Sequence, residues 1–270
     1  MTIPSARASR TAHAGEATGR SDGRLPAESV LQFTGVGKTF RDGTEALGDV
    51  SFGVRRGEFV SIVGPSGCGK STLLRMASGL SAPSKGRILS SYSSLGYVFQ
   101  DATLLPWRTV EKNIELPLLL SEVPKEARAE RVRKAIDLVG LNGFEKHYPR
   151  TLSGGMAMRT SLARALTLDP DLFLFDEPFG SLDAITRERL NEELLHIYRG
   201  QGFTGVFVTH SIPEAVYLSS RVVVMCGRPG CVVAEFAVPF EYPRTLDVQY
   251  STEFADLSRQ VSESLREVYQ

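Results

Sequence analysis

The chain has 270 residues, of which 42% are hydrophobic, and its 31 basic residues balance its 31 acidic ones. This length suits one large domain, or one domain with a subdomain, and a net charge of zero gives no electrostatic sign of nucleic-acid binding. Three cysteines without framework spacing argue against a secreted disulfide scaffold. No stretch has the roughly 18 apolar residues of a membrane helix, so we expect a chain that works inside a reducing compartment and does not span a membrane.

The first 27 residues are rich in Ala, Ser, Gly and Arg and have almost no bulky apolar side chains. Such a segment buries too little surface to offset the entropy of ordering it. We expect residues 1–27 to form a disordered tail; the alternative is a basic arm that touches lipid or RNA.

Residues 31–56 alternate apolar and polar positions around turn signals, which predicts short antiparallel strands. Further along, short continuous apolar runs predict strands buried on both faces of a parallel sheet; these runs are 58–64, 172–175, 205–209 and 221–225. Residues 124–140 have helical spacing between Pro124 and Gly140, and the segment from Ser251 predicts an amphipathic helix. The pattern indicates an α/β fold.

The sequence GPSGCGKS at 64–71 matches the phosphate-binding loop pattern G-x-x-x-x-G-K-[ST], between an apolar strand and a helical stretch. Its glycines leave backbone N–H groups free to surround phosphate oxygens, and a helix N-terminus adds positive partial charge. Lys70 is expected to reach the β- and γ-phosphates, and the Ser71 hydroxyl to coordinate Mg²⁺. The predicted nucleotide-binding residues here are Gly64, Pro65, Ser66, Gly67, Cys68, Gly69, Lys70, Ser71 and Thr72.

Cys68 lies inside this loop, at a position that the motif leaves open. It is either a redox switch or simply a tolerated small side chain, and the second interpretation is favoured because no base is near it in sequence. We expect its thiol to react with a maleimide in the free protein and to be protected by MgATP.

The apolar run at 171–175 ends in two carboxylates, Asp176 and Glu177. A carboxylate at the carboxyl edge of a sheet can hold the Mg²⁺ shell, which predicts Asp176 as a metal ligand. Glu177 is then the candidate general base for an attacking water.

The segment LSGGMAMRTSLARAL at 152–166 resembles the LSGGQ signature of ABC transporter ATPases, although Met156 replaces the usual Gln. The resemblance extends over about residues 30–240. It includes, in order, the phosphate loop, a Gln after a strand in YVFQD, the signature, the acidic pair, SLD at 181–183 and VTH at 208–210. It implies a P-loop NTPase core with a mostly parallel sheet, an N-terminal antiparallel β-subdomain and a helical subdomain near 101–165, together spanning 28–240, followed by a helical extension at 241–270.

By this resemblance, Gln100 contacts the metal and the attacking water, His210 contacts the γ-phosphate, and Phe40 stacks on adenine, unless Phe40 is a core residue. The signature residues Ser153, Gly154 and Gly155 open a helix and so offer a second anion-binding end. The resemblance implies that this end faces the phosphate loop of a second copy, or of a close relative, with Asp183 at the interface.

A finer likeness, in FQDATLLPW, DEPFGSLDAITRERL and RPG, points to the group that imports nitrate, sulfonates and taurine. Together with the family resemblance, it implies ATP and Mg²⁺ as ligands, transmembrane permease subunits as partners and an external solute-binding protein as an indirect partner. The expected location is peripheral, on the cytoplasmic face of the cell membrane. The alternatives are an ABC ATPase of translation or DNA maintenance, another P-loop enzyme such as a kinase, and an inactive regulator. The single uninterrupted cassette argues against the first alternative, and the signature argues against the second. The third would need the loss of Lys70, Glu177 or His210, and all three are present.

Leu104, Leu105 and Trp107 form an apolar cluster just after Gln100. Exposed apolar groups on a connecting segment mark docking surfaces, and the resemblance implies that this segment receives a helix of the permease. The alternative is that all three side chains fill the core of the helical subdomain.

Overall fold

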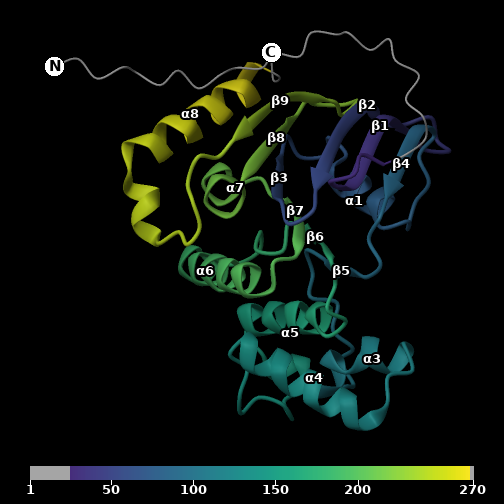
Figure 1. The fold of residues 1–270 in the computed structure, drawn as a ribbon, viewed down its shortest axis with the longest axis vertical. Coiled ribbons are helices and arrows are strands. Elements are labelled where there is room, and N and C mark those ends of the chain that lie inside the picture. Colours follow the sequence, from purple (N-terminus) through teal and green to yellow (C-terminus); the bar gives the residue numbers. More distant parts are fainter. Residues whose placement is uncertain (1–24, 268–270) are drawn as a thin grey trace.

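Two β-sheets organise residues 25–267, which are the residues described by the computed structural model of the chain (Figure 1). The first is antiparallel with strand order β2-β1-β4, and the second has the order β5-β6-β7-β3-β8-β9. The strands are β1 (Ser29–Thr39), β2 (Glu45–Arg55), β3 (Phe59–Val63), β4 (Lys85–Ser90), β5 (Leu95–Val98), β6 (Leu172–Asp176), β7 (Thr204–Val208), β8 (Arg221–Met225) and β9 (Val232–Ala237). Most of the tail predicted at 1–27 lies outside the described residues.

The second sheet is parallel from β5 to β8, and only β9 runs antiparallel, beside β8. All five residues of β3, β6 and β7 are buried, as expected for strands covered on both faces. The four strands predicted from apolar runs are therefore confirmed. The antiparallel strands predicted within 31–56 are also confirmed, as β1 and β2.

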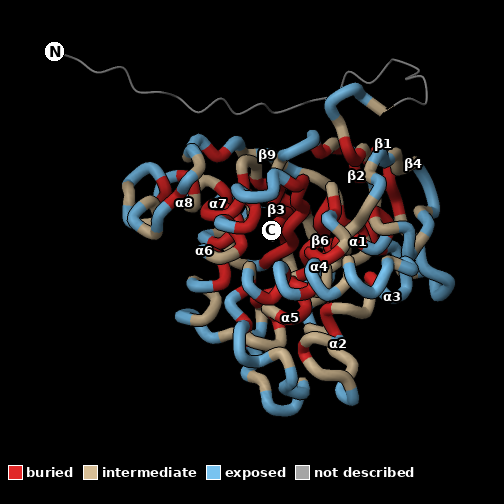
Figure 2. Tube along the Cα trace, turned by 60° about the horizontal axis from the view of Figure 1, so that its bottom comes forward, coloured by how far each residue is buried: buried red, intermediate tan, exposed pale blue. Residues whose placement is uncertain are grey.

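Alternate residues of the central strands enter two separate cores. Phe59 and Phe175 face a core completed by helices α2 to α8. Val60 and Leu174 face the opposite core, which is completed by the antiparallel sheet and α1. The strands between these cores form the buried centre of the molecule, and exposed residues lie mainly on the outer helices and loops (Figure 2).

The helices lie around the larger sheet, and α2 to α5 gather into a separate lobe beside β5 and β6 (Figure 1). Proline precedes α4 and Gly140 follows it with φ of 64°, the left-handed conformation that commonly ends helices. The helices are α1 (Lys70–Ala77), α2 (Val110–Ile114), α3 (Leu116–Leu120), α4 (Lys125–Leu138), α5 (Gly154–Leu166), α6 (Ala184–Gln201), α7 (Ile212–Leu218) and α8 (Thr252–Glu267), with 3₁₀ turns at Pro149–Thr151 and Leu246–Tyr250.

The C-terminal segment is tied to α7 by a buried arginine. The Arg244 guanidinium donates hydrogen bonds to the carbonyl oxygens of Val216, Tyr217 and Ser219 at the end of α7, over distances of 2.7–3.1 Å. The amphipathic helix predicted from Ser251 is α8, which buries Phe254, Leu257 and Val261. Within residues 25–267, no helix combines the length and the apolar character that crossing a membrane requires.

Candidate functional site

The strand order brings three loops together. β7 lies between β6 and β3, and these three strands run parallel. Their carboxyl ends therefore meet at one edge of the sheet, where ligands bind in open α/β sheets. The loop after β3 leads into Lys70 and Ser71 at the start of α1, the loop after β6 carries Glu177, and the loop after β7 carries His210.

The loop between β3 and α1 needs glycine at defined positions. Gly67 and Gly69 have φ of 76° and 97°, which L side chains rarely adopt. A Cβ on Gly69 would also lie 2.6 Å from a methyl carbon of Leu47 and 2.9 Å from the carbonyl oxygen of Ala46. The loop is thus pressed against the start of β2, which fixes its backbone in one shape.

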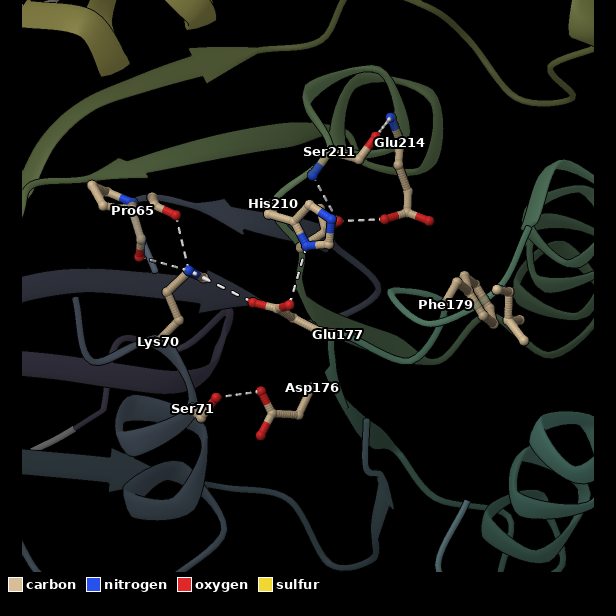
Figure 3. A network of polar contacts seen from close by, with 12 residues as sticks. Pro65, Lys70, Ser71, Asp176, Glu177, Phe179, His210, Ser211 and Glu214 are labelled. Carbon is tan, nitrogen blue, oxygen red and sulfur yellow. Dashed lines mark hydrogen bonds and ion pairs between the residues drawn. The ribbon is translucent and has the colours of Figure 1, made fainter. Parts of the chain in front are cut away.

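Lys70 is buried, and its ammonium group is held by the loop itself. Its Nζ donates hydrogen bonds to the carbonyl oxygens of Gly64 and Pro65 at 2.9 and 3.0 Å. It also forms an ion pair with Glu177, with Nζ and Oε1 3.7 Å apart (Figure 3). The sequence predicts both residues for the site, and the structure adds that each partly neutralises the other.

Ser71 and Asp176 meet below this pair (Figure 3). The Ser71 hydroxyl donates to Asp176 Oδ1 at 2.7 Å, and the Tyr97 hydroxyl donates to Asp176 Oδ2 at 3.3 Å. Burial raises the pKa of Tyr97, and the neighbouring Asp176 carboxylate raises it further, so the hydroxyl remains a donor. Asp176 is itself buried and forms no ion pair with any residue between 25 and 267. A buried carboxylate without a cationic partner, beside a serine hydroxyl, is a donor set that suits Mg²⁺.

Glu177 connects the lysine and the histidine of the site. Its backbone has φ of 46°, a left-handed conformation uncommon for a residue with a side chain and frequent at functional sites. Its Oε2 lies 3.1 Å from Nδ1 of His210, and its Oε1 faces Lys70. The carboxylate therefore lies between a lysine and a histidine, where it can accept a proton or orient a water molecule.

The loop that carries His210 is fixed by a buried carboxyl group. The Thr209 hydroxyl donates to Glu214 Oε2, while the backbone N–H groups of Ser211 and Glu214 donate to Thr209 Oγ1 and Ser211 Oγ (Figure 3). Burial raises the pKa of the Glu214 carboxyl, although the hydrogen bond from Thr209 and the charge of Arg187 oppose this. Both neighbours of His210 are thus anchored on α7.

A shallow cavity of about 310 Å³ opens over the phosphate loop and Glu177, whereas Asp176 and His210 do not line it. The residues of the phosphate loop that line it are Ser66, Gly67, Gly69, Lys70, Ser71 and Thr72, joined by Phe40, Thr44, Ala46, Gln100, Glu177 and Arg228. The Phe40 ring is 45% exposed, so the alternative that it is a core residue is wrong. The cavity brings together phosphate-binding groups, an aromatic ring, a candidate base and a candidate metal ligand.

The signature and Asp183 do not line this cavity. Ser153 caps α5 and accepts a hydrogen bond from the Met156 N–H at 3.3 Å, while Asp183 caps α6 in the same way through Thr186. The hydrogen bonds from Thr186 lower the pKa of Asp183. A Cβ on Gly155 would lie 2.8 Å from the Thr186 methyl group, so the starts of α5 and α6 touch each other. Within one chain, Ser153, Gly154 and Asp183 form a second, exposed surface, whereas Gly155 is buried beneath it.

The burial of Cys68 does not fit the expectation that its thiol reacts with a maleimide in the free protein. Its side chain is 1% exposed and packs in the core shared with the antiparallel sheet, and burial raises the pKa of the thiol. A buried, protonated thiol does not react readily with a maleimide. The interpretation as a tolerated small side chain fits this position, and the redox interpretation does not.

The segment after Gln100 is held in place from two sides. Asn113, which is fully buried, accepts a hydrogen bond from the Leu105 N–H at 2.7 Å and donates to the carbonyl oxygens of Leu105 and Arg108. Arg164 of α5 donates to the carbonyl oxygens of Ala102 and Thr103, each at 3.0 Å. Trp107 is 70% exposed, so it does not fill the core, and Leu104 and Leu105 are half-buried.

Sequence reasoning missed two residues of the site. Tyr97 comes from β5, and only the strand order reveals that its hydroxyl reaches Asp176. Arg228 lies far along the chain from the phosphate loop, yet it lines the cavity. The only mark of this arginine in the sequence is the motif RPG at 228–230, which by itself indicates a subgroup of the family and not a contact with the phosphate loop.

The fold and this site define a P-loop nucleotide-binding protein. The ABC transporter family profile matches residues 47–180. An uncharacterised ABC transporter ATP-binding protein of Methanocaldococcus jannaschii is 44% identical over 83% of this chain and 85% of its own length. The aliphatic sulfonates import ATP-binding protein SsuB of Bacillus cereus is 41% identical over 86% of this chain and 94% of its own length.

Among solved structures, the dimeric post-hydrolysis state of the ATP-binding cassette MJ0796, bound to ADP and Pi, superposes with a TM-score of 0.69. It is 32% identical, and the match covers 78% of this chain and all of that one. The chain belongs to the ABC transporter family as one of its ATP-binding proteins, and it is an ATPase.

Proposed function

We propose that this chain is the ATP-hydrolysing subunit of an importer, and that it works as a head-to-tail dimer beneath a separate permease on the cytoplasmic face of the membrane. The observation that carries the catalytic part is the contact of Glu177 with both Lys70 and His210, which come from the ends of three parallel strands, beside a cavity that Lys70 and Glu177 line. The relative SsuB, named for aliphatic sulfonate import, favours sulfonates or similar solutes as the transported class.

In this proposal the loop from Gly64 to Thr72 surrounds the phosphates of ATP, and Phe40 stacks on adenine. Lys70 turns from Glu177 to the β- and γ-phosphates, because a polyphosphate offers it more negative charge. Ser71, Asp176 and Gln100 would hold Mg²⁺, whose contribution is to neutralise charge on the β- and γ-oxygens.

Glu177 then accepts a proton from the attacking water. The water oxygen bonds to the γ-phosphorus, the bond from that phosphorus to the bridging oxygen breaks, and ADP leaves with the electron pair. His210 contacts the γ-phosphate and keeps Glu177 oriented through the 3.1 Å contact. This division of roles agrees with the positions of the three side chains.

The exposed surface formed by Ser153, Gly154 and Asp183 would complete the site of the second subunit. A helix N-terminus with free N–H groups attracts phosphate, and in this chain the start of α5 lies outside the cavity, where it is open to another molecule. A two-fold dimer places each signature against the other copy's nucleotide.

Two measurements test the proposal. Lys70→Ala should abolish most MgATP hydrolysis, while Lys146→Ala, which removes an exposed lysine outside the cavity, should not. A strain that lacks the gene should fail to grow on an aliphatic sulfonate as its sulfur source and grow normally on sulfate. Normal growth on the sulfonate would contradict the transported class, and an active Lys70→Ala variant would contradict the site.

A further inference from the structure

Arg228 is an exposed cation in the cavity that no role assigned above uses. It lies in the turn between β8 and β9, and it lines the cavity together with Ser66, Gly67 and Phe40. Its Nε donates a hydrogen bond to the carbonyl oxygen of Gly67 at 2.7 Å. The guanidinium lies so close to the phosphate loop that a Cβ on Gly67 would be 3.1 Å from Nη2.

The turn that carries Arg228 is fixed to the phosphate loop and to β2. The Gly230 N–H donates to the Ala46 carbonyl at 3.0 Å, and the Gly48 N–H donates to the Gly230 carbonyl at 2.9 Å. A Cβ on Gly230 would lie 2.0 Å from the carbonyl oxygen of Cys68, so only glycine allows this approach. The arginine is therefore presented by a rigid support rather than by a free loop.

The charge of Arg228 is uncompensated. Lys70, the other cation of the cavity, is paired with Glu177. None of the ion pairs among residues 25–267 involves Arg228, and over the same range its guanidinium makes only the Nε bond. A guanidinium has five N–H donors, so four remain for a ligand, and a planar fork of this kind suits phosphate oxygens.

We propose that Arg228 is a nucleotide-binding residue, and that it donates from Nη1 and Nη2 to a phosphate oxygen of the nucleotide held by the phosphate loop. The inference rests on the proposed nucleotide site and adds a charged contact to it from a part of the chain remote in sequence. The Nε bond to Gly67 aligns the guanidinium, and the free Nη groups bind the anion.

The test compares Arg228→Gln, which removes the charge, with Arg228→Lys, which keeps the charge but loses the Nε bond. Arg199→Gln is the matched control, since Arg199 is an exposed arginine at the end of α6, outside the cavity. Titration calorimetry with MgATP and MgADP gives the Kd of each variant, and thermal melting confirms that it is folded.

We expect Arg228→Gln to raise the Kd for MgATP about tenfold, the scale of one hydrogen bond to a charged group. Arg228→Lys should lose less, Arg199→Gln should match the wild type, and the difference should shrink as salt is added. A loss for both nucleotides places the contact on the α- or β-phosphate, and a larger loss for MgATP places it on the γ-phosphate.

A folded Arg228→Gln variant with wild-type affinity overturns the inference. So does an Arg228→Lys variant as weak as Arg228→Gln, because the bond to Gly67 rather than the charge would then matter. A wild-type chain that binds no MgATP at all would overturn the proposed function together with this inference.

Discussion

Replacing Glu177 by Gln separates two effects of this carboxylate. The amide keeps the shape of the side chain but cannot take up a proton, so hydrolysis should fall by about 10² or more, the scale of a lost catalytic proton-transfer group. The affinity for MgATP should instead rise. Lys70 Nζ and Glu177 Oε1 are 3.7 Å apart, and Coulomb's law gives about 1 kcal/mol for such a pair in water and ~4 kcal/mol at an effective dielectric constant of 20.

This attraction competes with the nucleotide for Lys70. Even its lower value corresponds to about a fivefold change in Kd, so Glu177→Gln should bind MgATP at least about fivefold more tightly than the wild type. Titration calorimetry and single-turnover hydrolysis measure the two effects, with Glu241→Gln as an exposed control outside the cavity. Turnover within tenfold of the wild type, or weaker binding of MgATP, would refute the reasoning. Light scattering of the variant with MgATP should also show a stable dimer, and a persistent monomer would count against the head-to-tail arrangement.

Three further results are expected. Cys68 should resist maleimide both with and without MgATP and react only when the protein unfolds, because its thiol is buried; mass spectrometry after labelling would show a folded-state adduct if this is wrong. Trp107→Ala should leave the melting temperature and basal ATP hydrolysis unchanged and weaken co-purification with the proposed permease, since Trp107 is 70% exposed; an unchanged yield of that partner would contradict the docking role. Because the pKa of Glu214 is raised in the folded state, the folded protein holds this proton more tightly than the unfolded chain. The free energy of unfolding should therefore fall as the pH rises above the ordinary value of 4.5. Urea titrations at pH 5 and 8 should show a smaller fall for Glu214→Gln than for the wild type. An equal fall in both proteins would exclude Glu214 as the cause of the pH dependence.

The parts of the fold that the sequence predicts are those where burial imposes a clear pattern of apolar residues. Continuous apolar runs predicted β3, β6, β7 and β8 because strands buried on both faces have no polar alternation. β4 was missed, since each of its residues is half-buried or exposed and no apolar run marks it. β9 is an edge strand in which half-buried and exposed residues alternate, which likewise gives a weak signal.

In the site, the loops were predictable and the contacts between them were not. The phosphate loop and the acidic pair are short motifs in which backbone chemistry restricts residue types at fixed spacing. The pairing of Lys70 with Glu177 and the reach of Tyr97 to Asp176 depend on the strand order, which no local pattern contains. The burial of the Cys68 side chain does not follow from the sequence, because an irregular loop has no periodicity from which to infer the direction of a side chain.

Arg164 lies in the last turn of α5 and Ser153 caps its first turn, so this helix connects two parts of the proposed site. Near one end, Arg164 donates hydrogen bonds to the carbonyl oxygens of Ala102 and Thr103, just after Gln100. At the other end, Ser153 lies in the exposed surface beside Asp183. Thirteen helical residues span about 20 Å, and a helix of this length packed in a core moves as a stiff rod. A shift of the Gln100 segment would then reach the signature as a displacement of the whole rod, with no need for a chain of small rearrangements in between.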